Sequence, residues 1–156
     1  MMRGFVHDKR RDGQALVEFS LAVIPFVFLL MGVVDLGRAI YTMNGTSEAA
    51  RDIARATIVH LSGGSGVIGT SDQTADVIAT QEGLVPGLAV DPATDIECVD
   101  KDGAVQNPRV TGDEPDCNVD KDFIRVHVSA PFTPITPLVS MFGSHTFESV
   151  SRMAIP

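Results

Sequence analysis

A run without a single charged residue constrains this chain more than any other feature. It spans Phe19 to Val34, "FSLAVIPFVFLLMGVV", and extends back to Gln14 if one carboxylate, Glu18, is admitted. The extended run is about 21 residues long, enough for a helix to cross a bilayer core about 30 Å thick. A chain of 156 residues with 44% hydrophobic content has room for this segment and one modest folded unit, which argues against a large enzyme. We predict one N-terminal membrane helix followed by one soluble domain.

The charged residues that flank the run predict its orientation. Residues 1–13, "MMRGFVHDKRRDG", hold four basic and two acidic side chains, whereas the net charge of the whole chain is −8. Basic flanks stay on the cytoplasmic side, so we expect the N-terminus inside and the domain outside. Removing the local surplus of +2 from −8 leaves −10 on the remainder. Such an acidic chain is not expected to bind nucleic acid.

These residues allow three interpretations of the apolar run. A secretory signal would have a shorter apolar region followed by small residues in an A-x-A-like arrangement, whereas this chain reads "DLGRAIYTM" after Val34. A plain single-pass anchor fits the length and the flanks but leaves Glu18 unexplained. A prepilin-like segment would be cut on the cytoplasmic side of the run, so the residues before Glu18 decide between the last two.

The residues around Gly13 resemble a known leader sequence. Gly13, the letters "QALV", and then Glu18 and Phe19 follow the G-xxxx-E-[YF] pattern of class III leaders of type IV pilins, in particular of the tight-adherence (Tad/Flp) branch. The continuation to "GRAIY", the later "SEAARDIARAT", and the C-terminal "FTPITPL" and "SVSRMAIP" are similar to TadE-like minor pilins, also called pseudopilins. The resemblance covers residues 13–60 and, more loosely, the C-terminal end.

This resemblance implies a function in assembly. A prepilin peptidase would cut between Gly13 and Gln14, which makes residues 1–13 a cytoplasmic leader, and Glu18 and Phe19 would be assembly residues. The mature chain would lie in the lipid of the bacterial inner membrane with its domain in the periplasm, before or after entering a pilus. Its implied partners are other pilins or pseudopilins, including the major Flp pilin and a TadF-like protein, together with the peptidase and the inner-membrane assembly platform.

The carboxylate of Glu18 has a physical explanation that does not need the family. A charged side chain costs up to about 2.5–3.5 kcal/mol at the centre of a bilayer and less near its surface, so the group snorkels, protonates or finds a cation. On an intact chain, Arg10 and Arg11 lie about two helical turns away. After cleavage, the new α-ammonium of Gln14 lies about one turn away on the same subunit, or equally close on a neighbour. The resemblance implies the pairing with a neighbour, which would set the register of assembly.

We expect one long N-terminal helix in two parts, a transmembrane part over residues 14–43 and an amphipathic continuation over residues 44–61. Asp35 and Arg38 are three residues apart and are expected to pair at the water boundary. A bend is expected near Gly45 at most, and the glycines of "SGGSG" at residues 62–66 would end the helix.

Pro25 lies inside the predicted span and should disturb it locally. Proline lacks a backbone donor and crowds the carbonyl four residues earlier, that of Leu21, which predicts a kink. The hydroxyl of Ser20 is expected to help satisfy the freed carbonyl.

The remaining residues, 62–156, are predicted to form a domain that makes the chain α+β, with a small antiparallel sheet packed on the N-terminal helix. A short second helix is expected at residues 71–82, capped by Ser71 or Asp72, with Ala75, Ile78 and Ala79 on its apolar face. Alternating patterns predict strands at residues 95–99, 122–130 and 145–155.

Two cysteines, Cys98 and Cys117, fall in the exported part, where an oxidising compartment favours a disulfide. Closing the loop between them is worth about 3 kcal/mol in the chain-entropy estimate. Within that loop and just beyond it, four oxygen-bearing side chains alternate in a D-x-N-x-D-x-D pattern: Asp116, Asn118, Asp120 and Asp122. The glycine turn and the terminal glutamate of an EF-hand are missing, so we favour a solvated acidic loop over a metal site.

No catalytic motif accompanies the four histidines, and we expect no catalytic residues and no cofactor. His127 and His145 are interpreted as surface positions on the sheet. The rival function is a permanently anchored extracytoplasmic binding module that is never processed as a pilin.

Overall fold

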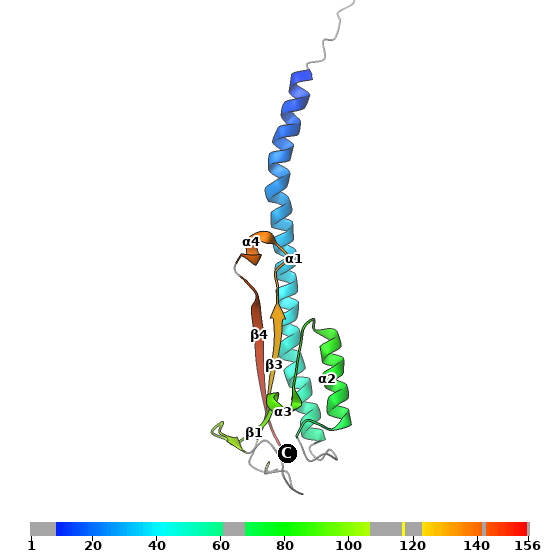
Figure 1. The fold of residues 1–156 in the computed structure, drawn as a ribbon, viewed down its shortest axis with the longest axis vertical. Coiled ribbons are helices and arrows are strands. Elements are labelled where there is room, and N and C mark those ends of the chain that lie inside the picture. Colours follow the sequence, from blue (N-terminus) through cyan, green and yellow to red (C-terminus); the bar gives the residue numbers. More distant parts are fainter. Residues whose placement is uncertain (1–8, 61–67, 107–116, 118–122, 142, 156) are drawn as a thin grey trace, which may run out of the picture.

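The computed structural model describes residues 9–60, 68–106, 117, 123–141 and 143–155. Over this part of the chain the fold is α+β, as predicted, with one long helix, a small antiparallel sheet and three shorter helices. Figure 1 shows the long helix upright, with the sheet and the second helix beside only its lower half. The upper half of the long helix extends beyond the rest of the described domain.

Helix α1 runs from Lys9 to Val59 as one uninterrupted element, and it continues through Pro25. The two predicted parts of the N-terminal helix are therefore continuous, and the helix ends close to the predicted residue 61. Residues 62–66, predicted to end it, lie outside the described residues. The helix also continues through Gly45, where an added Cβ would lie 2.6 Å from Cγ2 of Val85. Glycine at this position therefore allows Val85 to lie close to the backbone of α1. The sequence suggested a bend of the helix at Gly45 instead.

The sheet has the strand order β2-β1-β3-β4, and all its neighbours are antiparallel. The longest pairing joins β3 to β4, from Phe123 opposite Ala154 to Phe132 opposite His145. Three of the strands lie where alternation predicted them, whereas the two-residue β2 was not predicted. The strand bounds are β1 Ile96–Val99, β2 Val105–Gln106, β3 Phe123–Phe132 and β4 His145–Ala154.

The core lies between the lower half of α1 and one face of the sheet. Every second residue along most of β3 is buried, namely Ile124, Val126, Val128 and Ala130, in keeping with the alternation that predicted this strand. Facing them, α1 contributes buried small and branched side chains: Ala49, Ala50, Ile53 and Ala54. This pairing of small helix residues with branched strand residues lets the two layers approach each other closely.

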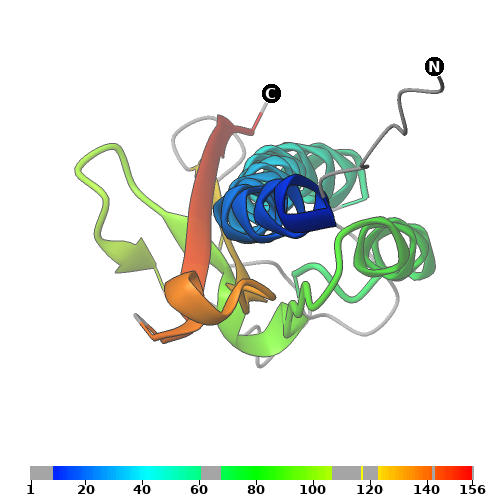
Figure 2. The ribbon, with the colours of Figure 1, turned by 90° about the horizontal axis from the view of Figure 1, so that it is seen from above.

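Helix α2, Asp72–Leu84, lies against a different side of α1 from the sheet, as Figure 2 shows along the helix axis. Ser71 caps it as predicted, its hydroxyl accepting the backbone N–H of Thr74 at 3.2 Å. The predicted face is only partly right, because Ile78 is buried whereas Ala75 and Ala79 are exposed. Thr74 takes their place in the core, where its hydroxyl lies 2.7 Å from that of Ser71. Burying a polar side chain costs little free energy when a neighbouring residue satisfies its hydrogen bonds. Such a residue cannot be found by looking for a pattern of apolar residues.

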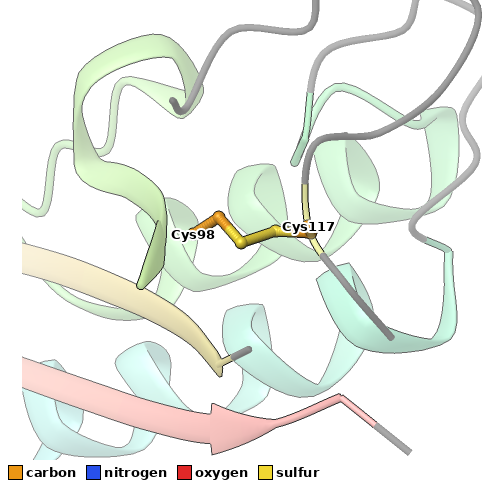
Figure 3. Close-up of a disulfide and its surroundings, with 2 residues drawn as sticks. All are labelled: Cys98 and Cys117. Carbon is orange, nitrogen blue, oxygen red and sulfur yellow. A yellow bond between two sulfur atoms is a disulfide. The ribbon is translucent and has the colours of Figure 1, made fainter. Parts of the chain in front are cut away.

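The predicted disulfide is present. Cys98, on β1, is bonded to Cys117, and their Cα atoms are 5.9 Å apart. Figure 3 shows the bond joining β1 to the short segment that carries Cys117. Both residues are buried and belong to the hydrophobic core. All four members of the acidic pattern, Asp116, Asn118, Asp120 and Asp122, lie outside the described residues.

Candidate functional site

The most unusual surface of the molecule is the upper part of α1, residues 13–34, which we call the free half of α1. None of these residues is buried, and the first buried residue that follows them is Asp35. Large apolar side chains point outward all around it, for example Leu16 and Leu29, which are 68% and 62% exposed. Within the described chain, α1 is the one helix that is long and apolar enough to cross a membrane.

The predicted cleavage and assembly residues lie together at the start of the free half. The side-chain amide of Gln14 donates a hydrogen bond to the carboxylate of Glu18, with 3.1 Å between Nε2 and Oε1. Space is open where a Cβ on Gly13 would lie, and the ring of Phe19 is 67% exposed. Because an amide is neutral, this hydrogen bond leaves the negative charge of Glu18 without compensation from Gln14.

The hydroxyl of Ser20 does not bond to the carbonyl that Pro25 leaves free, although the sequence suggested that it would. Its hydroxyl donates to the carbonyl of Leu16, at 2.8 Å, and not to that of Leu21. This contact is the ordinary way in which a serine inside a helix satisfies its hydroxyl, by bonding the carbonyl four residues earlier. It needs no proline nearby.

The second notable feature is the junction between α1 and the domain, at Asp35. Its carboxylate accepts two backbone N–H groups from the β3–β4 connection. Oδ1 lies 3.0 Å from the nitrogen of Ile135, and Oδ2 lies 2.7 Å from the nitrogen of Thr136. Thr136 is the N-cap residue of the short helix α4, Pro137–Ser140, and its own side chain makes no capping hydrogen bond. A carboxylate of α1 therefore holds the two backbone donors that directly precede helix α4, in a segment that is far away in sequence.

Arg38 completes the junction. Its guanidinium lies 3.3 Å from Oδ1 of Asp35, which confirms the predicted pair. The same group lies over the ring of Phe132, 5.5 Å from its centroid, and that ring contacts Phe147 at a centroid distance of 5.8 Å. One face of α1 is thus fastened to the end of the β3–β4 hairpin by charge, hydrogen bonds and aromatic contacts.

Sequence reasoning missed the bonds of Asp35 to the β3–β4 connection. One signal was present, because a carboxylate at the end of an apolar run must find donors if it is buried. A second signal was the segment "PITP", in which Pro134 and Pro137 have no N–H and the two residues between them, Ile135 and Thr136, carry its backbone donors. Nothing in the sequence connects the two signals, since they are 100 residues apart.

A further charged cluster lies on the outer face of the sheet, around Glu97. Its carboxylate accepts a hydrogen bond from Nε of Arg125 at 2.8 Å and lies 3.6 Å from Nε2 of His127. Both His127 and His145 are exposed, as predicted. The residues with described positions include no group of three or more metal-binding side chains close enough to hold an ion. The cluster is a cross-strand salt bridge in a shallow, open depression.

Comparisons with known proteins add one finding. The model of a family described as TadE-like protein matches residues 13–55, which comprise the free half of α1 and most of the part that packs on the domain. No curated protein and no solved structure matches the chain significantly.

Proposed function

Because residues 13–55 are TadE-like, which connects this chain with Tad pilus systems, we propose that it is a minor pilin that assembles through the free half of α1. It would enter a Tad/Flp-type pilus or the complex that initiates one, and until then it would lie in the inner membrane with its domain in the periplasm. The observation that carries the proposal is the free half itself. None of residues 13–34 is buried, and within the described domain only the β3–β4 connection and the segment around Pro86 come near their last two turns.

Such a surface is what an assembling helix needs. In lipid, helices associate through close van der Waals contacts and hydrogen bonds, because lipid tails are as apolar as the side chains. The free half offers exposed apolar side chains on every side, so neighbouring helices could pack along it in more than one direction. The disulfide-bonded domain is fastened to α1 at Asp35, and of its described residues those of the β3–β4 connection lie beside the last two turns of this surface.

Glu18 supplies the specificity in this mechanism. Before processing, its partner is the neutral amide of Gln14. Cleavage after Gly13 would create a positively charged α-amine at Gln14, and a charged partner binds a carboxylate more strongly than an amide does. Since the amine of each subunit can reach the carboxylate of the same or of an adjacent subunit, subunits in register would compensate each other's charges in a medium of low polarity. Packing out of register would leave both charges unpaired, which is costly in lipid.

The first test is the mass of the mature N-terminus in cells that contain a prepilin peptidase. The proposal requires the wild-type chain to begin at Gln14. Gly13→Leu should keep the leader, whereas Gly32→Leu, a matched change at a second open helical glycine, should be processed normally. An intact leader on the wild-type chain would overturn the proposal and favour the permanently anchored binding module.

The second test separates assembly from processing. Glu18→Gln keeps a group that can bond with Gln14 but removes the charge, so processing should be unchanged. Co-isolation with the other pilins of the system should fall by at least about tenfold. Glu48→Gln, at an exposed position further along α1, is the matched control and should assemble like the wild type. Undiminished association of the Glu18→Gln chain would show that the charge has no such role.

A further inference from the structure

We propose that the tip of the β3–β4 hairpin, residues 133–141, lies in the outer surface layer of the phospholipid bilayer beside α1. This hairpin tip would be a second membrane contact of the protein. The inference rests on the part of the proposed function that places the free half of α1 in a membrane. It does not depend on pilin processing or on assembly.

The first observation is the composition and exposure of the hairpin tip. From Pro131 to Ser144 the sequence "PFTPITPLVSMFGS" contains no charged residue. Met141 is 84% exposed and Ile135 is 62% exposed, although the chain as a whole is acidic. An uncharged surface segment with large exposed apolar side chains is typical of a site that meets a protein or a membrane.

The second observation is the level at which the hairpin tip lies along α1. Figure 1 shows α4 at the end of the hairpin that points toward the free half of α1. Ile135 and Thr136 line a small apolar pocket of about 220 Å³ together with residues of the predicted span: Val27, Leu30, Met31 and Val34. From Val27 to Val34 the helix rises about 10 Å. If the apolar run lies in lipid, the hairpin tip must therefore lie at the depth of its last two turns.

The third observation concerns backbone donors, which must be satisfied within the protein before a segment can enter lipid. Pro134 and Pro137 have none, and the N–H groups of Ile135 and Thr136 are taken by Asp35. Further along, three more N–H groups bond to carbonyls of the hairpin tip itself, those of Val139, Ser140 and Met141. The hydroxyl of Ser140 also donates within the tip, to the carbonyl of Pro137 at 2.9 Å.

Together these observations select lipid as the partner. The tip lies beside the last turns of the apolar run, and the donors that it satisfies internally lower the cost of placing it in lipid. The side chain of Arg38, 44% exposed beside Asp35, lies where a cation can reach phosphate groups at the bilayer surface. The bonds of Asp35 thus set the depth of the hairpin tip relative to the helix.

The absence of tryptophan from the chain makes a direct test possible, because an introduced tryptophan is the sole one. The full chain is placed at a low protein-to-lipid ratio in vesicles of phosphatidylcholine and phosphatidylglycerol, with the domain outside. Met141→Trp probes the hairpin tip, Leu29→Trp probes the span, and Val105→Trp probes β2 at the other end of the domain. All three replaced side chains are exposed, so the substitutions should not disturb the core.

We expect the fluorescence of the Met141→Trp chain to be quenched by lipids that carry a spin label near the headgroup, at a depth of about 5–10 Å. The Leu29→Trp chain should be quenched by labels deep in the acyl chains, and the Val105→Trp chain only by iodide in the water. Ile135→Trp provides a second probe of the tip and should behave like Met141→Trp.

The other outcomes separate this inference from the pilin proposal. If Leu29→Trp is quenched by deep labels but both tip probes respond only to iodide, the tip is in water, and the pilin proposal remains. If Leu29→Trp is not quenched by lipid labels either, the helix does not span the bilayer and both proposals fail. If the tip is quenched as expected but the wild-type chain keeps its leader in cells, the pilin proposal fails alone.

Discussion

Asp35 on α1 accepts a hydrogen bond from the backbone nitrogen of Thr136, 2.7 Å away in space and 101 residues away in sequence. This contact lies at the boundary between two parts of the helix. Before Asp35, from residue 13 on, no residue of α1 is buried, and after it the helix begins to pack on the domain. One side chain therefore marks where the helix changes its environment and also fixes the position of the hairpin tip.

We predict that Asp35→Asn loosens the hairpin tip selectively. The amide group that replaces one carboxylate oxygen brings a donor toward backbone donors, so the single remaining oxygen must serve both N–H groups and the bonds to them weaken. Hydrogen exchange of the amides of Ile135 and Thr136, measured by mass spectrometry in detergent micelles, should accelerate by at least about tenfold. The amide of Val126, in the middle of the sheet, should be unaffected.

Arg38→Gln is the matched control for this prediction. It removes the half-exposed ion pair but leaves the two backbone bonds of Asp35 in place, and exposed pairs contribute little. Exchange at the hairpin tip should change by less than about threefold. Equal protection in the Asp35→Asn chain and the wild type would mean that the carboxylate does not hold the tip.

A second prediction concerns Gly45, where α1 touches the residue that follows α2. A Cβ at this position would lie 2.6 Å from Cγ2 of Val85, so Gly45→Ala should lower the free energy of unfolding of the domain by about 1–3 kcal/mol. Gly83→Ala, in α2, adds a Cβ that meets no atom within 4 Å and should raise that free energy by about 0.5–1 kcal/mol.

The measurement for both glycine variants is proteolysis of the domain as a function of urea concentration, in detergent. Adding Val85→Ala to the Gly45→Ala chain makes room for the new methyl group. The double variant should therefore lose less free energy of unfolding than the sum of the losses in the two single variants. Strict additivity would show that the cost at Gly45 does not come from this contact.

A third prediction concerns the disulfide. Reduction, or the double substitution of Cys98 and Cys117 by serine, should lower the free energy of unfolding of the domain by about 3 kcal/mol, because the unfolded chain regains the freedom of the open loop. Reductant should destabilise the wild-type chain and leave the double variant unchanged. An equal response of both chains to reductant would mean that the bond does not contribute to stability.

The part of the fold that could be predicted from the sequence depends on neighbours along the chain. The helix over the apolar run, the cap at Ser71, the pair of Asp35 with Arg38 and the alternation in β3 all arise between residues a few positions apart. The cysteine pair was predictable for a different reason, since the chain contains only two cysteines. The TadE-like character was likewise readable from a short continuous stretch.

The sequence by itself therefore determined the apolar helix and the α+β class. Only the tertiary structure decided that Asp35 accepts backbone donors from a segment 101 residues away, that Gly45 makes room for Val85, and that Thr74 is buried where Ala75 is not. These outcomes depend on which surfaces meet when a helix, a sheet and a second helix pack together. Periodicity indicates which side of an element is apolar. The contacts between distant residues form only when the elements pack together in the folded chain.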